Sequence, residues 1–294
     1  MERAMAIDLG GRAMVISGAS SGIGAATALA CAQAGMPVAL GARRADRLAE
    51  LAAQIEARGG RALWMAMDVA DAAACRALVD RAAEAFGGVY GVFANAGYGL
   101  EAAVHRMSDA QLREMFEVNF FGSLNLIRPA VERMLAAPGQ GPRGHVLWCS
   151  SCLARMPLPY YGAYSATKAA QHHMGRAMRA ELRGTGVRVS TVHPVGTKTE
   201  FFDTVQRRSG IASLIQHTSG RLMQSPETVA RAVVRTLRRP RAEVWTSLVV
   251  RWGMALCAAM PGVEDPVINR MVRRRRANSS DQPTPAITGQ VGAG

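Results

Sequence analysis

Short apolar runs alternate with longer amphipathic segments through the first 200 residues. The apolar runs have strand length, and they lie at 13–17, 37–42, 62–67, 89–95, 145–150 and 187–193. Ala-rich helical patterns separate them, at 22–34, 46–59, 71–87, 108–136 and 162–184. Strands that alternate with such helices predict βαβ units, and runs that are apolar throughout predict strands covered on both faces. We therefore predict an α/β fold, a Rossmann-type doubly wound parallel sheet of about seven strands in three α/β/α layers.

Glycines and prolines mark where these segments end. Gly35, Gly59 and Gly87 each follow a helical pattern, as glycines at helix C-termini do. Pro129 lies inside the pattern 108–136 and predicts a kink in that helix.

The C-terminal third follows the alternation less closely. The irregular stretch 199–225 predicts a mobile excursion from the sheet that helps to form a pocket. Ser225, as an N-cap, and Pro226, at the first helical position, predict a helix over 225–239. Residues 242–250 predict a last strand.

Length and composition fit one large domain with additions at its end. The chain has 294 residues, 49% of them hydrophobic and 19% charged, so it can bury a sizeable core. We expect a Rossmann-type domain over 1–250, a basic helical C-terminal extension over 251–276 and a disordered tail over 277–294, which is polar and rich in Gly and Pro.

The sequence gives no sign of export or of a membrane span. The first residues include an early acid and no apolar signal region, and no apolar run reaches the roughly 18 residues that a spanning helix needs. Five cysteines, an odd and modest number, fit reduced thiols. We expect a cytoplasmic protein.

The charge is strongly positive, at +13, and residues 201–294 carry 14 basic against 6 acidic side chains. Arginine supplies nearly all of it, since Lys168 and Lys198 are the only lysines. Aromatic residues, at 5%, are too few to pair with basic clusters as nucleic-acid binders require, so we expect no nucleic-acid partner. The run Arg273–Arg276 is best interpreted as a solvated helix end, with contact to anionic lipid or nucleic acid as the alternative.

A glycine-rich turn follows the first predicted strand. In SGASSGIG, Gly18, Gly22 and Gly24 would let backbone N–H groups approach a pyrophosphate at the start of a helix, whose N-terminal dipole favours the anion. The same letters also fit the G-x-S-x-G nucleophile elbow of an α/β-hydrolase, centred on Ser20. An elbow normally follows several strands instead of opening the sheet, so a dinucleotide site is the better interpretation.

The end of the second strand carries no acidic residue, and Arg43 and Arg44 follow it. An acid at this point would hydrogen-bond the ribose 2′-hydroxyl of NAD, whereas a guanidinium fits the 2′-phosphate of NADP. The pair favours NADP(H) over NAD(H), with NAD(H) left open.

Tyr164 and Lys168 stand four residues apart at the start of a predicted helix and so share one face. A nearby ammonium favours the phenolate of a tyrosine, which would make Tyr164 a general acid/base near neutral pH. Ser151 ends the fifth strand, where open α/β sheets bind ligands, and its hydroxyl could hydrogen-bond a substrate carbonyl.

Other reactive side chains fit packing better than chemistry. Cys149 and Cys152 straddle a strand end, unlike a redox pair that reaches into a helix. Neighbouring His172 and His173 diverge by about 100° on a helix and cannot share a ligand. We expect no metal site.

Five motifs together resemble the short-chain dehydrogenase/reductase family over about residues 10–250. They are SGASSGIG at 17–24, ANAG at 94–97, Asn119 in VNFFG, Ser151, and YSATK at 164–168, and they fall in the family's order and spacing.

The resemblance implies a nicotinamide-dependent oxidoreductase with catalytic residues Asn119, Ser151, Tyr164 and Lys168. Tyr164 would exchange the proton, and Lys168 would bind the nicotinamide ribose and lower the pKa of Tyr164. Ser151 would orient the reacting oxygen, and Asn119 would hold a water of the proton relay. Asp68 would face the adenine. The full cofactor set would be Gly18, Ser20, Ser21, Gly22, Ile23, Gly24, Arg43, Arg44, Asp68, Val69, Asn95, Ala96, Gly97, Tyr164, Lys168, Pro194, Val195, Gly196, Thr197 and Thr199.

Three positions depart from the family pattern. Val195 stands where the family usually has glycine after the proline, which could reshape the loop that holds the nicotinamide carboxamide. Ala94 replaces a common asparagine, and Arg155 replaces a small residue just beyond the serine, at the mouth of the pocket.

The sequence thus predicts hydride transfer between nicotinamide and a carbonyl or secondary alcohol, with a non-catalytic NADP-binding sensor or scaffold as the alternative. An apolar substrate follows from the expected pocket residues Tyr98, Leu100, Leu153, Met156, Leu158, Phe201 and Phe202. By analogy with relatives we expect a homodimer or homotetramer assembled through the helices at 108–136 and 162–184.

Overall fold

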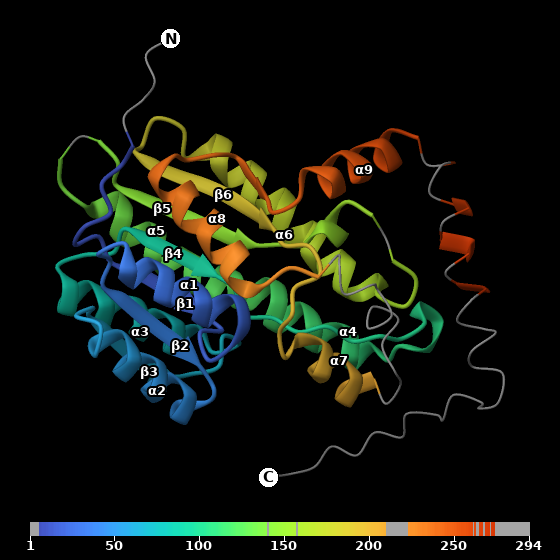
Figure 1. The fold of residues 1–294 in the computed structure, drawn as a ribbon, viewed down its shortest axis with the longest axis horizontal. Helices are drawn as coiled ribbons and strands as arrows, with labels where there is room; N and C mark the ends of the chain where they lie inside the picture. The colour runs from blue at the N-terminus through green and yellow to red at the C-terminus, as the bar shows by residue number, and fades with distance from the viewer. Residues whose placement is uncertain are drawn as a thin grey trace.

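The computed structural model has a seven-stranded parallel sheet with the order β3-β2-β1-β4-β5-β6-β7 (Figure 1). It describes residues 6–139, 141–156, 158–209 and 223–260, and eight positions between 262 and 273. The strands are β1 Met14–Ser17, β2 Val38–Ala42, β3 Ala62–Ala66, β4 Gly91–Ala94, β5 Gly144–Cys149, β6 Val187–His193 and β7 Glu243–Trp245. The predicted α/β fold and doubly wound sheet are confirmed.

Helices cover both faces of this sheet, as the apolar strands predicted. The main helices are α1 Gly22–Gln33, α2 Ala45–Glu56, α3 Ala72–Phe86, α4 Asp109–Phe116, α5 Gly122–Ala136, α6 Gly162–Glu181, α7 Phe201–Ser209, α8 Pro226–Arg238 and α9 Leu248–Ala259. The described residues also form two short 3₁₀ segments, η1 Val104–Arg106 and η3 Cys152–Ala154, and a π-helical segment, η2 Glu117–Phe121.

Two apolar cores form because side chains alternate across each strand. Met14 and Ile16 of β1 pack with α1, α2 and α8 in one core, while Val15 packs with α3 and α5 in the other. Phe93 of β4 likewise belongs to the first core and Val92 to the second. Figure 1 shows α1 and α8 side by side over one face. The strands are all parallel, so their carboxyl ends lie along one edge of the sheet between the two cores.

The predicted helix over 108–136 is two helices with a widened turn between them. α4 ends at Phe116, a π-helical turn spans Glu117–Phe121, and α5 runs from Gly122 to Ala136 with Pro129 inside it. Pro129 therefore does not end the helix, and the π turn is an additional feature that hydrophobic periodicity does not reveal.

The C-terminal third differs from its prediction at two points. The last strand ends at Trp245, and residues from Leu248 onward form α9, because Ser247 caps a helix there through the N–H of Val250. The start of the irregular stretch is helical, since Phe201–Ser209 form α7. Residues 210–222 and the predicted tail 277–294 lie outside the described residues.

The predicted helix over 225–239 is present as α8, with Pro226 in its first turn. Ser225 occupies the N-cap position, yet its hydroxyl lies 3.3 Å from the hydroxyl of Thr228 and makes no cap to a backbone N–H. Within the described part of the chain, no helix is long and apolar enough to cross a bilayer.

Candidate active site

The predicted site residues gather at the carboxyl ends of β1, β4, β5 and β6. The sheet order reverses between β1 and β4, the place where open α/β sheets bind nucleotides. The glycine-rich turn follows β1, Asn95 follows β4, Ser151 follows β5, and the residues from Pro194 to Thr199 follow β6. The topology thus brings segments far apart in sequence to one edge.

The glycine-rich turn is packed so closely that its glycines cannot be replaced. A Cβ atom on Gly24 would lie 2.2 Å from the carbonyl oxygen of Gly18, and Gly18 itself has a φ of +64°. The Asn95 amide donates to the carbonyls of Ser17 and Gly18, and the Ser17 hydroxyl accepts from the N–H of Asn95. β4 therefore fixes the shape of the turn before any ligand arrives.

The first turn of α1 fits a phosphate group. Ser21 stands at the N-cap, but its hydroxyl accepts from Arg44 at 2.8 Å instead of capping a backbone N–H. The Arg44 guanidinium also donates to the Ser20 hydroxyl at 3.1 and 3.2 Å. Helix N–H groups, two hydroxyls and a guanidinium thus converge as an anion would require. Among the described residues, the Ser20 hydroxyl is bonded by Arg44 and not by the imidazole that a hydrolase nucleophile needs.

Arg43 and Asp68 flank this turn at the surface. Their closest charged atoms are 4.0 Å apart, and the side chains are 72% and 44% exposed. Arg44 instead forms a 2.8 Å ion pair with Glu200, which lies just beyond β6. Ile23 packs on the first core and Val69 is buried in the second. Of the two predicted arginines, only Arg44 contacts the turn.

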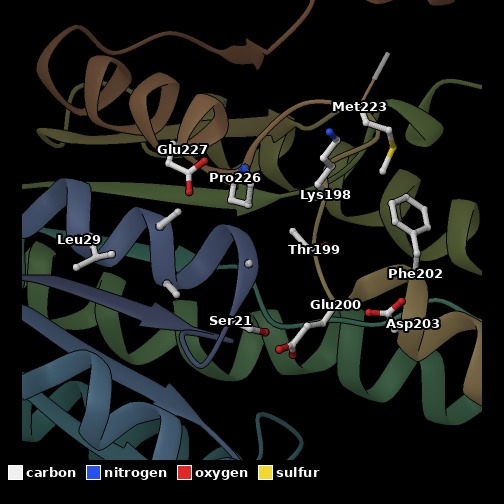
Figure 2. A pocket seen from close by; sticks show the side chains of 13 residues that line it. Ser21, Leu29, Lys198, Thr199, Glu200, Phe202, Asp203, Met223, Pro226 and Glu227 are labelled. Carbon is white, nitrogen blue, oxygen red and sulfur yellow. The ribbon is translucent and has the colours of Figure 1, made fainter. Parts of the chain in front are cut away.

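A cavity of about 730 Å³ opens beside the same turn (Figure 2). Gly22 and Ser21 line one side, and Thr199, Glu200 and Phe202 line the other. In Figure 2, the side chains of Glu200 and Ser21 point toward each other. Phe202 lines this cavity and is not a member of the apolar cluster around Tyr164, so its predicted substrate contact stays a prediction. The four predicted catalytic residues do not line it.

Tyr164 and Ser151 meet in a buried environment. Tyr164 is 9% and Ser151 7% exposed. Burial raises the pKa of Tyr164 well above its usual range, and a hydrogen bond with the Ser151 hydroxyl acts in the opposite direction. The expected lowering of the pKa of Tyr164 by Lys168 is therefore not found in this structure, because desolvation of the phenolate dominates.

Lys168 lies on the same face of α6 as predicted. Its ammonium is 5.7 Å from the centroid of the Tyr164 ring, and it donates to the Cys149 carbonyl at 2.8 Å and to Gln171 Oε1 at 3.0 Å. Burial lowers the pKa of Lys168. The buried charge is held by neutral acceptors.

Asn119 lies in the π turn η2 and is fully buried. Its side chain accepts from the N–H of Tyr98 at 2.9 Å and donates to the Tyr98 carbonyl at 2.9 Å and to the Thr167 hydroxyl at 3.1 Å. The amide thus ties η2 to the segment after β4 and to α6. Gly97 packs closely against this amide, since a Cβ atom on Gly97 would lie 2.9 Å from Asn119 Oδ1. The N–H of the neighbouring Ala96 donates to the Ser17 hydroxyl.

The backbone of the segment after β6 is held by hydrogen bonds, although Val195 stands where the family usually has glycine. The Thr197 hydroxyl donates to the Val195 carbonyl, the N–H of Val195 donates to Thr246, and Gly196 accepts from the N–H of Gln224. Pro194 accepts from the N–H of Cys152, beside the catalytic candidates. Thr199 packs against Gly22, with its methyl 2.9 Å from where a Cβ would be.

An apolar cluster surrounds the Tyr164 ring. Its members are Tyr98, Leu100, Met115, Leu158, Tyr161, Ala163 and Val205, with Met107, Val118, Leu153 and Phe201 at its border. The Tyr164 and Phe201 rings are 5.4 Å apart. Five of the seven expected pocket residues, Tyr98, Leu100, Leu153, Leu158 and Phe201, thus lie together.

The other side chains that the sequence singled out are paired or buried. Arg155 forms a 2.8 Å ion pair with Glu243 of β7. Cys149 and Cys152 are free and buried. Among the described residues, no group of three His, Cys, Asp or Glu side chains could hold a metal ion.

Sequence reasoning missed Ser17, Glu200 and Gln171. Gln171 is fully buried and lies three residues after Lys168 and seven after Tyr164. That spacing on one helix face was a signal that could have identified it.

Comparisons with known proteins show which family this chain resembles. The family model for short chain dehydrogenases matches residues 12–210. Glycine betaine reductase ATRR of Emericella nidulans is 34% identical over 242 residues, or 82% of this chain, but the match spans only 19% of that protein. The oxidoreductase Lmo0432 of Listeria monocytogenes is 30% identical over 234 residues, 78% of this chain and 91% of that protein.

Solved structures of short chain dehydrogenases have a similar fold. A short chain dehydrogenase from Burkholderia cenocepacia in complex with NADP superposes with a TM-score of 0.69 at 28% identity, over 81% of this chain and 97% of that one. One from Mycobacterium paratuberculosis bound to NAD gives 0.71 at 23% identity with the same coverage, a likeness of fold alone. The chain therefore belongs to the short-chain dehydrogenase family and is an oxidoreductase of that family.

Proposed function

We propose that the protein is an NADP(H)-dependent oxidoreductase that interconverts a carbonyl and a secondary alcohol on an apolar substrate. The observation that carries this proposal is the buried group of Tyr164, Ser151, Lys168 and Asn119 at the switch point of the sheet. A hydroxyl donor, a phenol and an ammonium in one water-poor site suit proton exchange with a carbonyl oxygen.

Each catalytic candidate has its own role at the carbonyl oxygen of the substrate. A bound nicotinamide supplies or accepts the hydride at the carbonyl carbon. With its raised pKa, Tyr164 is a neutral phenol near pH 7 and can give its proton to the oxygen. Ser151 donates a hydrogen bond to the same oxygen, where charge develops, and the Lys168 ammonium stabilises the phenolate that remains. Asn119 holds η2 and α6 in place around these side chains through its hydrogen bonds to Tyr98 and Thr167.

The preference for NADP(H) rests on Arg44. It donates to both turn serines and pairs with Glu200, so its guanidinium is directed across the phosphate-binding turn. The 2′-phosphate of NADP(H) would give the Arg44 guanidinium a doubly charged partner in place of the Glu200 carboxylate. The other predicted cofactor contacts, including Asp68 toward the adenine and Thr199 toward the nicotinamide, belong to the same proposal.

The apolar substrate follows from what surrounds the Tyr164 ring. Tyr161, Leu158 and Val205 are fully or almost fully buried around it, and Phe201 packs on it. The hydrophobic effect therefore favours a substrate that brings apolar groups to this cluster.

A substrate screen tests the function directly. Purified protein is mixed with NADPH or NADH and a panel of aliphatic, alicyclic and aromatic carbonyls, and with the oxidised cofactors and the matching alcohols, while the reduced-nicotinamide absorbance is followed. We expect turnover, faster with NADPH and with apolar substrates. Tight NADPH binding with no turnover across the panel would favour the alternative, a non-catalytic sensor or scaffold.

We also propose that the protein is cytoplasmic and assembles as a homodimer or homotetramer through α4, α5 and α6. Exposed apolar side chains lie on or beside these helices, among them Leu112 of α4, Phe121 of η2 and Met174 of α6, which are 40%, 45% and 40% exposed. Light scattering on the purified protein tests the subunit number.

The C-terminal extension is proposed to touch an anionic membrane surface. Leu248, Trp252 and Leu256 lie four residues apart on one stripe of α9 and are 64%, 66% and 51% exposed, while Val250, Met254 and Cys257 are half-buried. α9 packs only lightly against the body, near η3, and stands out from it in Figure 1. Arg251 borders the stripe, and residues 261–276 hold five arginines against two acids, which suits anionic lipid.

A further inference from the structure

Gln171 joins two parts of the candidate active site that no other side chain described connects in this way. Its Oε1 accepts from the Lys168 ammonium at 3.0 Å. Its Nε2 donates to the Asn119 carbonyl at 2.5 Å and to the Ser123 hydroxyl at 2.7 Å. The side chain is fully buried, so water does not compete for these bonds.

The orientation of this amide is fixed by its surroundings. Two acceptors, Asn119 O and Ser123 Oγ, stand on one side, and the ammonium of Lys168, which can only donate, stands on the other. A flipped amide would place its NH₂ group against the ammonium and its oxygen against a carbonyl. Only the observed orientation satisfies every group, so Gln171 always presents its oxygen to Lys168.

The π turn makes this link available. In an α-helix the carbonyl of Asn119 would accept from a backbone N–H four residues on, whereas η2 is wound as a π-helix. The Asn119 carbonyl accepts hydrogen bonds from two side chains, the Gln171 amide and the Ser123 hydroxyl, the latter at 2.7 Å. The widened turn thus gives α6 an attachment point on η2.

An amide also suits the charge at this position. The titratable groups that face Lys168 are the Cys149 thiol from β5 and the Tyr164 phenol from α6, while η2 and α5 present neutral Asn119 and Ser123. A buried ammonium needs acceptors, and a glutamate here would supply one but would cancel much of the charge at Tyr164. A glutamine accepts the hydrogen bond and leaves the charge in place.

We propose that Gln171 is a positioning residue that directs the Lys168 ammonium toward Tyr164 and keeps it protonated, using the π-turn carbonyl of Asn119 as its anchor. The role of Lys168 in the reaction rests on the proposed function, but the link between Gln171 and Lys168 does not.

The composition of the chain allows a direct test. Only two lysines are present, so protein labelled with ¹³Cε-lysine gives two side-chain signals, which Lys198→Arg assigns. The pH titration of the Lys168 signal is compared in the wild type, Gln171→Leu, Gln171→Glu and the surface control Gln54→Leu. We expect the apparent pKa of Lys168 to fall by about one unit or more in Gln171→Leu, to rise in Gln171→Glu and to stay unchanged in Gln54→Leu.

Kinetics then separate positioning from packing. We expect Gln171→Leu to lower kcat about 10- to 100-fold with the KM of the carbonyl substrate within threefold, and Gln171→Glu to recover part of kcat with a pH–rate profile shifted upward. Identical Lys168 titrations in the wild type and both folded variants would overturn the proposal. If the titrations shift as expected while no substrate turns over, the positioning role stands and the proposed function fails.

Discussion

At the scale of single residues, two neighbouring arginines have different surroundings. Arg44 contacts Ser20, Ser21 and Glu200, whereas Arg43 extends into solvent with only a 4.0 Å approach to Asp68. The sequence identified the pair but could not rank its members, because the backbone direction after β2 decides which side chain turns toward the glycine-rich turn.

This difference predicts which arginine selects the cofactor. We expect Arg44→Gln to raise the Kd of NADPH about 10- to 100-fold, since charge-assisted hydrogen bonds to a phosphate are lost, and to change the Kd of NADH less than threefold. Arg43→Gln is the matched control and should change neither value more than about threefold. Fluorescence titration measures both constants, and equal losses for NADPH and NADH would contradict a role in selectivity.

The catalytic candidates were predictable for a simple reason. Tyr164 and Lys168 lie four residues apart on one helix, and Ser151 ends a strand, so local geometry alone brings them toward one edge. Gln171 shares that helix face, but its partner Asn119 is 52 residues away, and only the fold reveals the contact.

At the scale of elements, the glycine-rich turn is the most tightly constrained part of the site. Gly24→Ala would place a methyl group 2.2 Å from the Gly18 carbonyl oxygen and 2.8 Å from the Asn95 amide. We expect loss of measurable NADPH binding and a drop of about 1–3 kcal/mol in the free energy of unfolding. Gly253→Ala, in open space on α9, should leave binding intact. Calorimetry and urea denaturation provide the two readouts, and NADPH binding by Gly24→Ala at wild-type affinity would refute this account of the turn.

Element types were more predictable than element boundaries. The βα alternation gave the first six strands and their order of appearance, because periodicity reports local burial. It missed the π turn at Glu117–Phe121 and the change from β7 to α9, since both depend on neighbours distant in sequence.

The exposed stripe of α9 gives an element-scale prediction. We expect the wild type to co-sediment with vesicles that contain phosphatidylglycerol more than with pure phosphatidylcholine, and Trp252→Ser combined with Leu256→Ser to weaken binding about tenfold or more. Trp64→Ser, an exposed tryptophan on β3 with 37% exposure, is the control and should bind normally. If the double variant instead dissociates an oligomer while vesicle binding is unchanged, a second copy covers α9.

At the scale of the whole molecule, buried histidines make stability depend on pH. Burial lowers the pKa of His145 to about 3 and those of His172 and His193 to about 4. Between pH 4 and 6.5 the unfolded chain binds protons at these positions that the native state does not. Stability is therefore complete above about pH 6.5 and is lost as the pH falls toward 4.

We expect the free energy of unfolding to decrease by about 1.4 kcal/mol per pH unit for each of these histidines over that window. His145→Gln should reduce the slope by roughly one such increment, and the exposed His105 serves as control through His105→Gln. Urea denaturation at several pH values gives the slopes. A flat profile from pH 7 to 5 would show that the histidines are not held neutral.

The central claim is that Tyr164 exchanges the proton with the substrate oxygen, and removing its hydroxyl tests that claim most directly. Tyr164→Phe is compared with the wild type and with Tyr90→Phe, whose hydroxyl is buried without a hydrogen-bond partner among the described residues. We predict that Tyr164→Phe lowers kcat/KM about 100- to 10,000-fold while the Kd of NADPH stays within threefold, and that Tyr90→Phe keeps full activity. Wild-type turnover by Tyr164→Phe would contradict the mechanism.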